Sequence, residues 1–398
     1  MASPQFRRNV TAAALLFLAA WGAYATYGLG AQNGLFDTIH ASLDVENPYV
    51  PGGVSPLRTR YVASPVIDKH ITVLISFFSY AIDPPHTKDV DVTSLVVMAH
   101  FCAGWALIRF EGWRLGNKQK LIAWTTAIGL FMQMTTPWAI TIPLYLLVQL
   151  YTSPISNPEV GPSFVAVAAD PVDLLLLPFC SIIAFIVPAI MMWYPGLPAY
   201  SHYGWDFTWQ IFPVREYAIA LVCKFILKRV LKAQAGGQHY LKNSRKAYDY
   251  SLFVATASQL IAIAACVLPA KAVPEAIRPW VADSTFANVF APFWPWNSPA
   301  VGPSALINGN GLADLSRLFL QWDMLTGNTA LLIWALHQHR RAVPNASLAS
   351  RLKILGTWIP LGGPVGAAAA LLRDRDDRLA LRTAQRRAGE VVRETKAK

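Results

Sequence analysis

Residues 121–151 read LIAWTTAIGLFMQMTTPWAITIPLYLLVQLY, a run of 31 residues without a charged side chain. A helix needs roughly 20 apolar residues to cross the hydrocarbon core of a bilayer. Pro137 and Pro143 lie inside this run, and proline interrupts a helix because it lacks the amide donor and clashes with the preceding turn. The run therefore predicts either one kinked membrane helix or a tight pair of helices.

Comparable apolar segments occur on both sides of this run, and the sequence predicts about 8 membrane spans, with 7–9 as the range. The other segments lie near residues 10–27, 66–82, 92–110, 172–193, 214–231, 250–269, 312–336 and 354–372. The predicted fold is an all-α, polytopic transmembrane helical bundle. Residues 1–372 are expected to form a single transmembrane helical domain, and residues 373–398 a basic cytoplasmic tail. The basic loops do not alternate cleanly along the chain, so the topology stays open.

The composition supports a membrane protein, because 54% of the 398 residues are hydrophobic and only 14% are charged. A soluble domain carries about 25% charged residues. This contrast excludes a disordered chain and an ordinary soluble enzyme. The formal net charge is +11, but the basic residues gather beside apolar segments, as in loops that meet anionic lipid headgroups. We therefore expect the lipid bilayer, and not nucleic acid, as a partner; the oligomeric state stays unknown.

Familiar catalytic motifs are missing from the sequence. There is no GxxxxGK[ST] loop, no HExxH pair, no GxSxG elbow and no aspartate-rich prenyltransferase motif. The 4 cysteines are widely spaced and form no CxxC pair. The sequence therefore predicts an activity without a metal or another cofactor, carried by side chains and in particular by carboxylic acids.

Carboxylic acids at membrane depth are functional candidates by default, and several also have a structural explanation. Asp170 and Asp173 enclose Pro171, a combination that favours the start of a helix. Asp68 has two readings that stay open. Either Ser64 caps a helix and Asp68 meets its positive end, or Asp68 and His70 form an acid and its partner.

Two further candidates have weaker cases for catalysis. Asp83 precedes Pro84 and Pro85, where a helix must stop, so a role in a turn stands beside a catalytic one. His100 lies in the middle of an apolar segment, which favours a hydrogen-bonded core histidine. Both residues nevertheless remain candidates for the catalytic site.

Asp323 is the main candidate, because it lies within Phe319-Leu320-Gln321-Trp322-Asp323 near the middle of a predicted span, with no helix end expected nearby. At helical spacing it shares a face with small and apolar residues, namely Ser316, Leu320, Thr326, Gly327 and Ala330. That face predicts either the floor of a cavity or a tight helix contact. Gln321 and Asn328 lie on another face, so this helix must be buried in the bundle.

The chemistry open to Asp323 follows from burial. Removal from water disfavours the charged form of a carboxyl, so a buried acid can stay protonated and donate its proton. The 14 Trp, 14 Tyr and 19 Phe residues supply ring faces that stabilise carbocations. The competing reading of Asp323 is a structural hydrogen bond between helices.

The segments Phe319-Leu320-Gln321-Trp322-Asp323 and Pro143-Leu144-Tyr145-Leu146-Leu147, in an apolar chain of this length, resemble the integral membrane terpene cyclases of ascochlorin- and ascofuranone-type meroterpenoid clusters in fungi. The resemblance implies a metal-independent enzyme of secondary metabolism in the endoplasmic reticulum membrane. Its general acid would open a terminal epoxide on a lipophilic prenylated substrate and start an isomerising cyclisation. A membrane transporter and a non-catalytic membrane scaffold are the alternatives. The predicted catalytic residues are Asp323, Asp68, Asp83 and His100.

Overall fold

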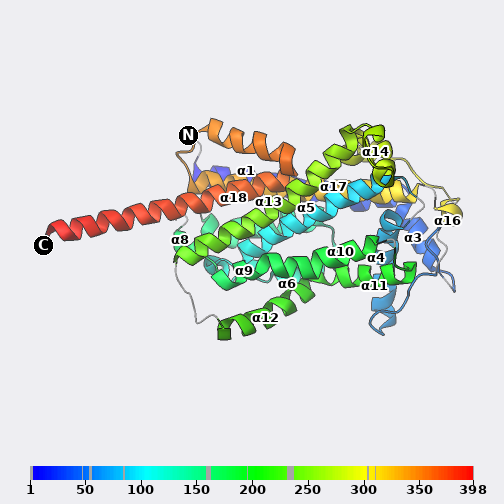
Figure 1. Ribbon diagram of the computed structural model, residues 1–398, viewed down its shortest axis with the longest axis horizontal. Helices are drawn as coiled ribbons and strands as arrows, with labels where there is room; N and C mark the ends of the chain where they lie inside the picture. The colour runs from blue at the N-terminus through cyan, green and yellow to red at the C-terminus, as the bar shows by residue number, and fades with distance from the viewer. Residues whose placement is uncertain are drawn as a thin grey trace.

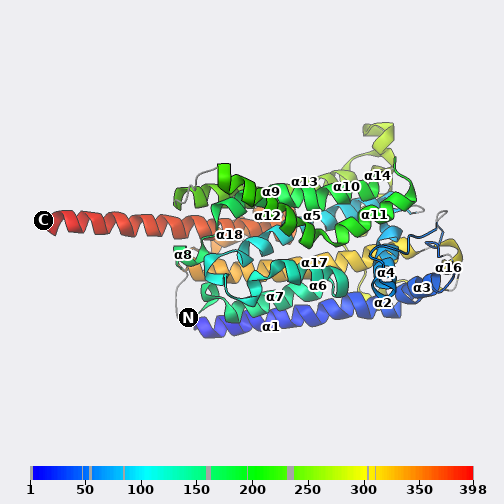
Figure 2. The same cartoon turned by 90° about the horizontal axis from the view of Figure 1, so that it is seen from below.

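The computed structural model describes residues 3–46, 48–52, 56–83, 86–157, 163–194, 196–230, 237–302, 304–309 and 311–397. Across these ranges the chain is helical, with one isolated bridge between Tyr49 and Pro56 as its only extended pairing. Figures 1 and 2 show an elongated bundle whose long helices follow one axis and from which the end of the last helix projects. The all-α prediction is confirmed.

The α-helices are α1 (Pro4–Ala23), α2 (Leu29–Gln32), α3 (Leu35–Leu43), α4 (Pro65–Ile82), α5 (Lys88–Gly112), α6 (Thr125–Thr135), α7 (Trp138–Thr152), α8 (Phe164–Val167), α9 (Pro171–Ser181), α10 (Val187–Trp193), α11 (Ala199–Gln210), α12 (Phe212–Val230), α13 (Gly237–Val267), α14 (Arg278–Asp283), α15 (Phe286–Phe290), α16 (Ala305–Asn308), α17 (Leu312–Ala342) and α18 (Leu348–Ala397). π-Helical turns at Tyr24–Gly28 and Ile182–Ile186 join α1 to α2 and α9 to α10. Short 3₁₀ turns lie at Leu115–Asn117, Leu121–Ala123, Pro154–Ser156, Ala270–Ala272, Glu275–Ile277 and Pro295–Asn297.

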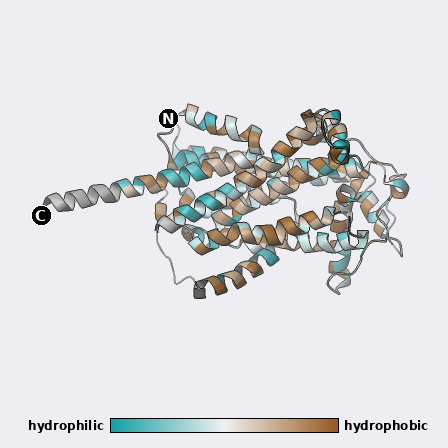
Figure 3. Cartoon of the chain, in the orientation of Figure 1, coloured by the Kyte–Doolittle hydropathy of each residue, from teal (hydrophilic) through white to brown (hydrophobic). Residues whose placement is uncertain are grey.

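Six helical stretches in the described ranges are long and apolar enough to cross a membrane, fewer than the eight that the sequence predicts. They are Pro4–Gln32, Pro65–Ile82, Lys88–Gly112, Phe164–Trp193, Tyr240–Val267 and Leu348–Gln385. The predicted spans near residues 214–231 and 312–336 form α12 and α17, which are not among these six stretches. Figure 3 shows hydrophobic residues along the middle of the long helices and hydrophilic ones toward the bundle ends.

The apolar run at residues 121–151 forms a tight pair of helices, one of its two predicted alternatives. The outer ends of α6 and α7 meet at the same end of the bundle, since the Tyr145 hydroxyl donates to the Ile122 carbonyl at 3.0 Å. The Ser153 hydroxyl likewise donates to Asn117 at 2.6 Å. The tip between the two helices lies partway along the bundle, where the buried Trp138 packs against α5 and α17. The pair is therefore a re-entrant hairpin that enters and leaves from one side.

Buried charges join α5, α13 and α18 near the outer ends of the hairpin. Arg114 contacts Glu111 at 2.6 Å and Asp376 at 3.0 Å, while Arg375 contacts Glu111 at 2.8 Å. The Tyr248 hydroxyl of α13 donates to Asp376 at 2.8 Å. The boundary predicted at residue 373 thus falls inside α18, which carries two buried charged residues beyond it. The division into a membrane domain and a cytoplasmic tail stays a prediction.

Helix α4 takes a different direction from the long helices. Figures 1 and 2 both show it running across the long axis, at the end of the bundle away from the chain termini. Its inner face packs on α3, α5, α11 and α17. Because the tip of the re-entrant hairpin points toward this end, α4 closes a space between itself and the tip.

Candidate functional site

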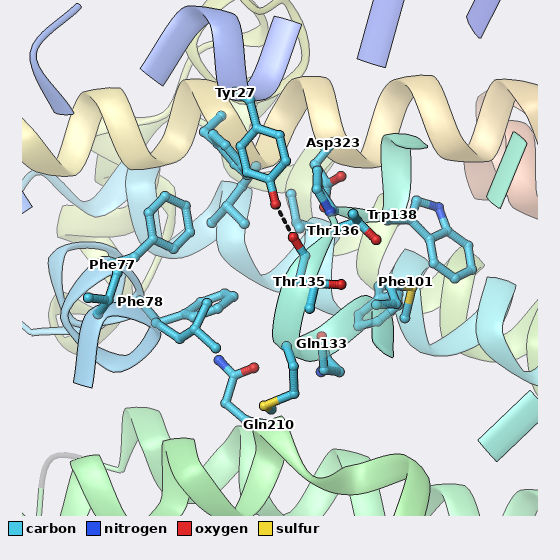
Figure 4. A pocket seen from close by; sticks show the side chains of 18 of the residues that line it. Tyr27, Phe77, Phe78, Phe101, Gln133, Thr135, Thr136, Trp138, Gln210 and Asp323 are labelled. Carbon is cyan, nitrogen blue, oxygen red and sulfur yellow. Dashed lines mark hydrogen bonds between the residues drawn. The ribbon is translucent and has the colours of Figure 1, made fainter. Parts of the chain in front are cut away.

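A cavity of about 440 Å³ lies between the hairpin tip and α4. Figure 4 shows side chains from several helices that converge on it. Eight aromatic side chains take part in its walls: Tyr27, Phe36, Phe77, Phe78, Phe101, Trp138, Trp209 and Phe319. The polar groups that line it are His40, His70, Gln133, Thr135, Thr136, Gln210 and Asp323. The site is therefore a mainly apolar cavity that is lined by aromatic side chains and a smaller number of polar groups.

Asp323 of α17 contributes the only carboxyl among the residues that line this cavity. Its Oδ1 accepts the backbone N–H of Ala139 at 2.7 Å. Ala139 lies in the first turn of α7, where backbone N–H groups have no partner inside their own helix. Asp323 therefore caps a helix that belongs to a distant part of the chain. The premise that no helix end lies near Asp323 is wrong, because the break in the hairpin brings one to it.

The stripe of small residues beside Asp323 serves both of its predicted purposes. Leu320 and Asp323 line the cavity, whereas Gly327 packs directly against the indole ring of Trp138. The Trp138 Nε1–H donates to Asn328 Oδ1 at 3.1 Å, which fixes the ring on α17. Gln321 and Asn328 of α17 are buried inside the bundle, as the sequence predicts.

The break in the hairpin also leaves carbonyl groups at the end of α6 that need donors. The Tyr27 hydroxyl donates to the Thr135 carbonyl, the bond drawn in Figure 4, and His70 Nε2 donates to the Met134 carbonyl. Three separate segments therefore hold the tip: Tyr27 from the π-turn after α1, His70 from α4 and Asp323 from α17.

The aromatic rings around the cavity pack edge to face. Phe101 and Trp138 have ring centroids 4.9 Å apart at 73°, and Phe77 and Phe319 have centroids 5.0 Å apart at 66°. Edge-to-face packing fixes the direction of each ring. Ring faces that remain toward the cavity present the negative side of the quadrupole to a bound cation.

Asp68 lies at the start of α4 and does not line this cavity. Its Oδ1 accepts the N–H groups of Tyr61 and Val62, both at 2.8 Å, and so fixes the segment before the helix. His70 bonds the hairpin tip and not Asp68. Ser64 makes no side-chain capping bond, so that part of the prediction is wrong. The geometry favours the structural reading of Asp68, and its catalytic role stays a prediction.

Asp83 also lies outside the cavity, at the end of α4. Its N–H donates to the Ser79 carbonyl at 2.8 Å, and its carboxyl accepts from His202 Nδ1 at 2.9 Å. Burial raises the pKa of this carboxyl, while the contact with His202 opposes the rise. Pro84 and Pro85 lie outside the described residues. Asp83 therefore joins α4 to α11, and its catalytic role stays untested.

His100 of α5 is 1% exposed and lies at a kink of α18 rather than at the cavity. Gly363 has φ 62°, and a Cβ added there would lie 2.5 Å from Cε1 of the His100 ring. Only glycine combines this backbone conformation with so close an approach. The position is that of a core histidine, and a catalytic role stays a prediction.

The capping role predicted for the acids around Pro171 is confirmed. Asp170 Oδ1 accepts the Val172 N–H at 2.9 Å at the start of α9. Lys224 lies 3.1 Å from Asp170 and 2.6 Å from Asp173. Within the described ranges, no three His, Cys, Asp or Glu side chains come together in a way that could hold a metal ion.

Comparison with known proteins places the chain among fungal enzymes. A family model described as the CtvD domain matches residues 11–380. Terpene cyclase ctvD of Aspergillus terreus is 24% identical over 367 residues, covering 90% of this chain and 96% of the relative. Terpene cyclase ascI of Acremonium egyptiacum is 25% identical over 396 residues, covering 94% and 93%. Terpene cyclase janA of Penicillium janthinellum is 26% identical over 342 residues, covering 84% of each. No solved structure matches the chain. The resemblance to fungal terpene cyclases is confirmed.

Proposed function

The chain belongs to the CtvD-domain family and is a terpene cyclase, and we propose that it works inside the endoplasmic reticulum membrane by protonating a terminal epoxide with Asp323. The substrate is a lipophilic intermediate with a prenyl chain. The observation that carries the proposal is the Asp323 carboxyl on the wall of the aromatic cavity, where Oδ1 is held by the Ala139 N–H.

The hydrogen bond to Ala139 directs the proton of Asp323. An N–H group can only donate, so Oδ1 must accept and the proton of the neutral acid resides on Oδ2. Once that proton leaves, the positive end of α7 and the same N–H stabilise the carboxylate that remains. The cap therefore stabilises the carboxylate that the proton transfer leaves behind.

The proposed reaction is an isomerisation, because the substrate gains one proton from Asp323 and later loses one to a base; proton exchange with the surroundings then restores the acid and the base. The Oδ2–H bond of Asp323 breaks and the proton adds to the epoxide oxygen. The bond from that oxygen to the more substituted carbon breaks, and the nearest alkene supplies the electron pair for a new C–C bond. Later alkenes attack the resulting cations in turn, and a base removes the last proton. The rings that line the cavity stabilise the cations without reacting with them.

The size and position of the cavity suit a substrate that arrives from the bilayer. Its volume of about 440 Å³ lies within the range of roughly 300–1,000 Å³ that small-molecule sites occupy. His40, His70 and Thr135 line the cavity and are also exposed, so it reaches the surface of the bundle beside the hairpin tip. A prenyl chain dissolved in lipid can enter there without crossing water.

The proposal is tested by supplying membranes that contain the protein with an epoxidised farnesyl-phenol and, separately, with the same compound lacking the epoxide. Epoxide opening predicts that only the epoxide is consumed, giving a cyclic product of unchanged mass. Membranes prepared without the protein are the control. Equal consumption of both compounds, or conversion of the epoxide to a diol alone, would overturn the proposal.

A further inference from the structure

The cavity has a second polar wall that the proposed proton transfer does not use. Gln133 of α6 and Gln210 at the end of α11 both line the cavity. Figure 4 shows Gln133 and Gln210 on the side away from Tyr27 and Asp323, with Phe77 and Phe78 on one flank of the space between them and Phe101 and Trp138 on the other. A bound chain that touches Asp323 at one end therefore has its other end near these amides.

Gln210 offers the cavity a hydrogen-bond acceptor. Its side chain is buried, and Nε2 donates to Asp206 Oδ1 at 3.3 Å, one turn earlier on α11. One N–H of the NH₂ group is held in this way, and the carbonyl Oε1 is available to accept from a ligand. Burial raises the pKa of Asp206 well above its ordinary value, and the nearby Asp83 raises it further. Asp206 thus holds the Gln210 amide through its Oδ1.

Gln133 offers the complementary donor. Its Nε2 is buried and has no hydrogen-bond partner in the part of the chain that the structure describes. An unpartnered buried N–H group is costly, and a ligand in the cavity supplies the missing acceptor. A hydroxyl group both donates and accepts, so it matches the acceptor of Gln210 and the donor of Gln133 together.

We infer that Gln133 and Gln210 bind the hydroxylated aromatic head of the substrate, with Asp206 as the positioning residue for Gln210. Binding at this wall lays the prenyl chain along the aromatic rings and carries its far end to Asp323. The direction of the substrate in the cavity rests on the proposed function, whereas the recognition of the hydroxyl group does not.

The test measures binding of two unreactive probes, farnesyl-phenol and its methyl ether, to purified protein in detergent. The phenol can donate to Gln210, whereas the ether cannot, so the wild type should bind the phenol at least fivefold more tightly. Gln210→Leu should bind both probes equally. Gln133→Leu should weaken both by a similar factor, because each probe oxygen can accept from Gln133.

Asp206 is tested through the same preference. Asp206→Asn keeps an oxygen that accepts the Gln210 N–H, so it should retain the preference for the phenol, whereas Asp206→Leu should lose it. The unfolding midpoint is measured for every variant, and Gln210→Met replaces Gln210→Leu if the latter does not fold. A folded Gln210 variant that keeps the full preference would overturn the inference.

The probes lack an epoxide, so this test is separate from the test of the proposed function. A wild type that prefers the phenol but leaves the epoxide unchanged would contradict the proposed function alone. A wild type that cyclises the epoxide while Gln210→Leu keeps its preference for the phenol would contradict only the role given to the amides.

Discussion

The contact between Gly327 and Trp138 gives the sharpest prediction about the hairpin tip. A Cβ added to Gly327 would lie within 3.0 Å of three atoms of the Trp138 ring, so Gly327→Ala must displace the ring. Overpacking of this kind costs about 1–3 kcal/mol, and loss of the bond from Trp138 to Asn328 adds about 1 kcal/mol. The next residue after Trp138 is Ala139, whose N–H holds Asp323. A displacement of about 1 Å there is enough to lower the cyclisation rate by about 100-fold.

Gly356→Ala is the matched control, because Gly356 also lies in a long helix and a Cβ there meets nothing within 4 Å. Alanine favours a helix over glycine by about 1 kcal/mol, so the control should be as stable as the wild type or more stable. Thermal unfolding in detergent and cyclisation by membranes are measured for both variants. If Gly327→Ala matches Gly356→Ala in unfolding midpoint and in rate, the tip contact does not position the acid and the reasoning is refuted.

Two further changes test how the tip and the charged end are held. Tyr27→Phe removes the donor to the Thr135 carbonyl, which should cost about 1 kcal/mol and lower the cyclisation rate less than Gly327→Ala does; an unchanged unfolding midpoint would contradict this. Arg375→Met leaves Glu111 and Asp376 with fewer buried partners, at a cost of about 3–5 kcal/mol. The matched change Arg245→Met removes an exposed pair worth about 0–1 kcal/mol. Recovery of folded protein by gel filtration should therefore fall for Arg375→Met only, and equal recovery of the two variants would refute the structural role of the buried charges.

The re-entrant hairpin was partly predictable from sequence. The length of the apolar run and the position of Pro137 indicate a break, and the sequence allows a pair of helices there. That the pair turns back inside the bundle depends on partners far along the chain. Ala139 and Asp323 are separated by 184 positions, and no local pattern links a helix start to an acid at that distance.

The residues of the candidate site could likewise be predicted only in part from the sequence. Asp323 could be singled out because the middle of an apolar segment gives a carboxyl no local explanation. Tyr27, Gln133 and Gln210 could not be singled out, because tyrosine and glutamine near helix ends are ordinary in a membrane protein. The helix break at Pro137 predicts that the carbonyl groups before it need hydrogen-bond donors. Only the packing of the helices shows that Tyr27 and His70 are those donors.

The two buried charges near the start of the charged end of the chain could not be predicted from sequence, for a related reason. A dense run of charges after residue 372 is typical of a solvated tail. Arg375 and Asp376 are nevertheless buried, because Glu111 of α5 and Arg114, just after that helix, neutralise them. Buried charges are tolerated where they pair, and a pairing over more than 260 positions leaves no signal in a single sequence.

The cyclisation rate of Asp323→Asn, measured at equal amounts of folded protein, tests the central claim most directly. Asparagine keeps an oxygen that accepts the Ala139 N–H but has no acidic proton, so the helix cap is retained while the acid is lost. The account predicts an unchanged unfolding midpoint and a rate lowered by about 10²–10⁴-fold, while Asp68→Asn and Asp83→Asn keep most of the activity. A folded Asp323→Asn protein that cyclises the epoxide at the wild-type rate would contradict the account.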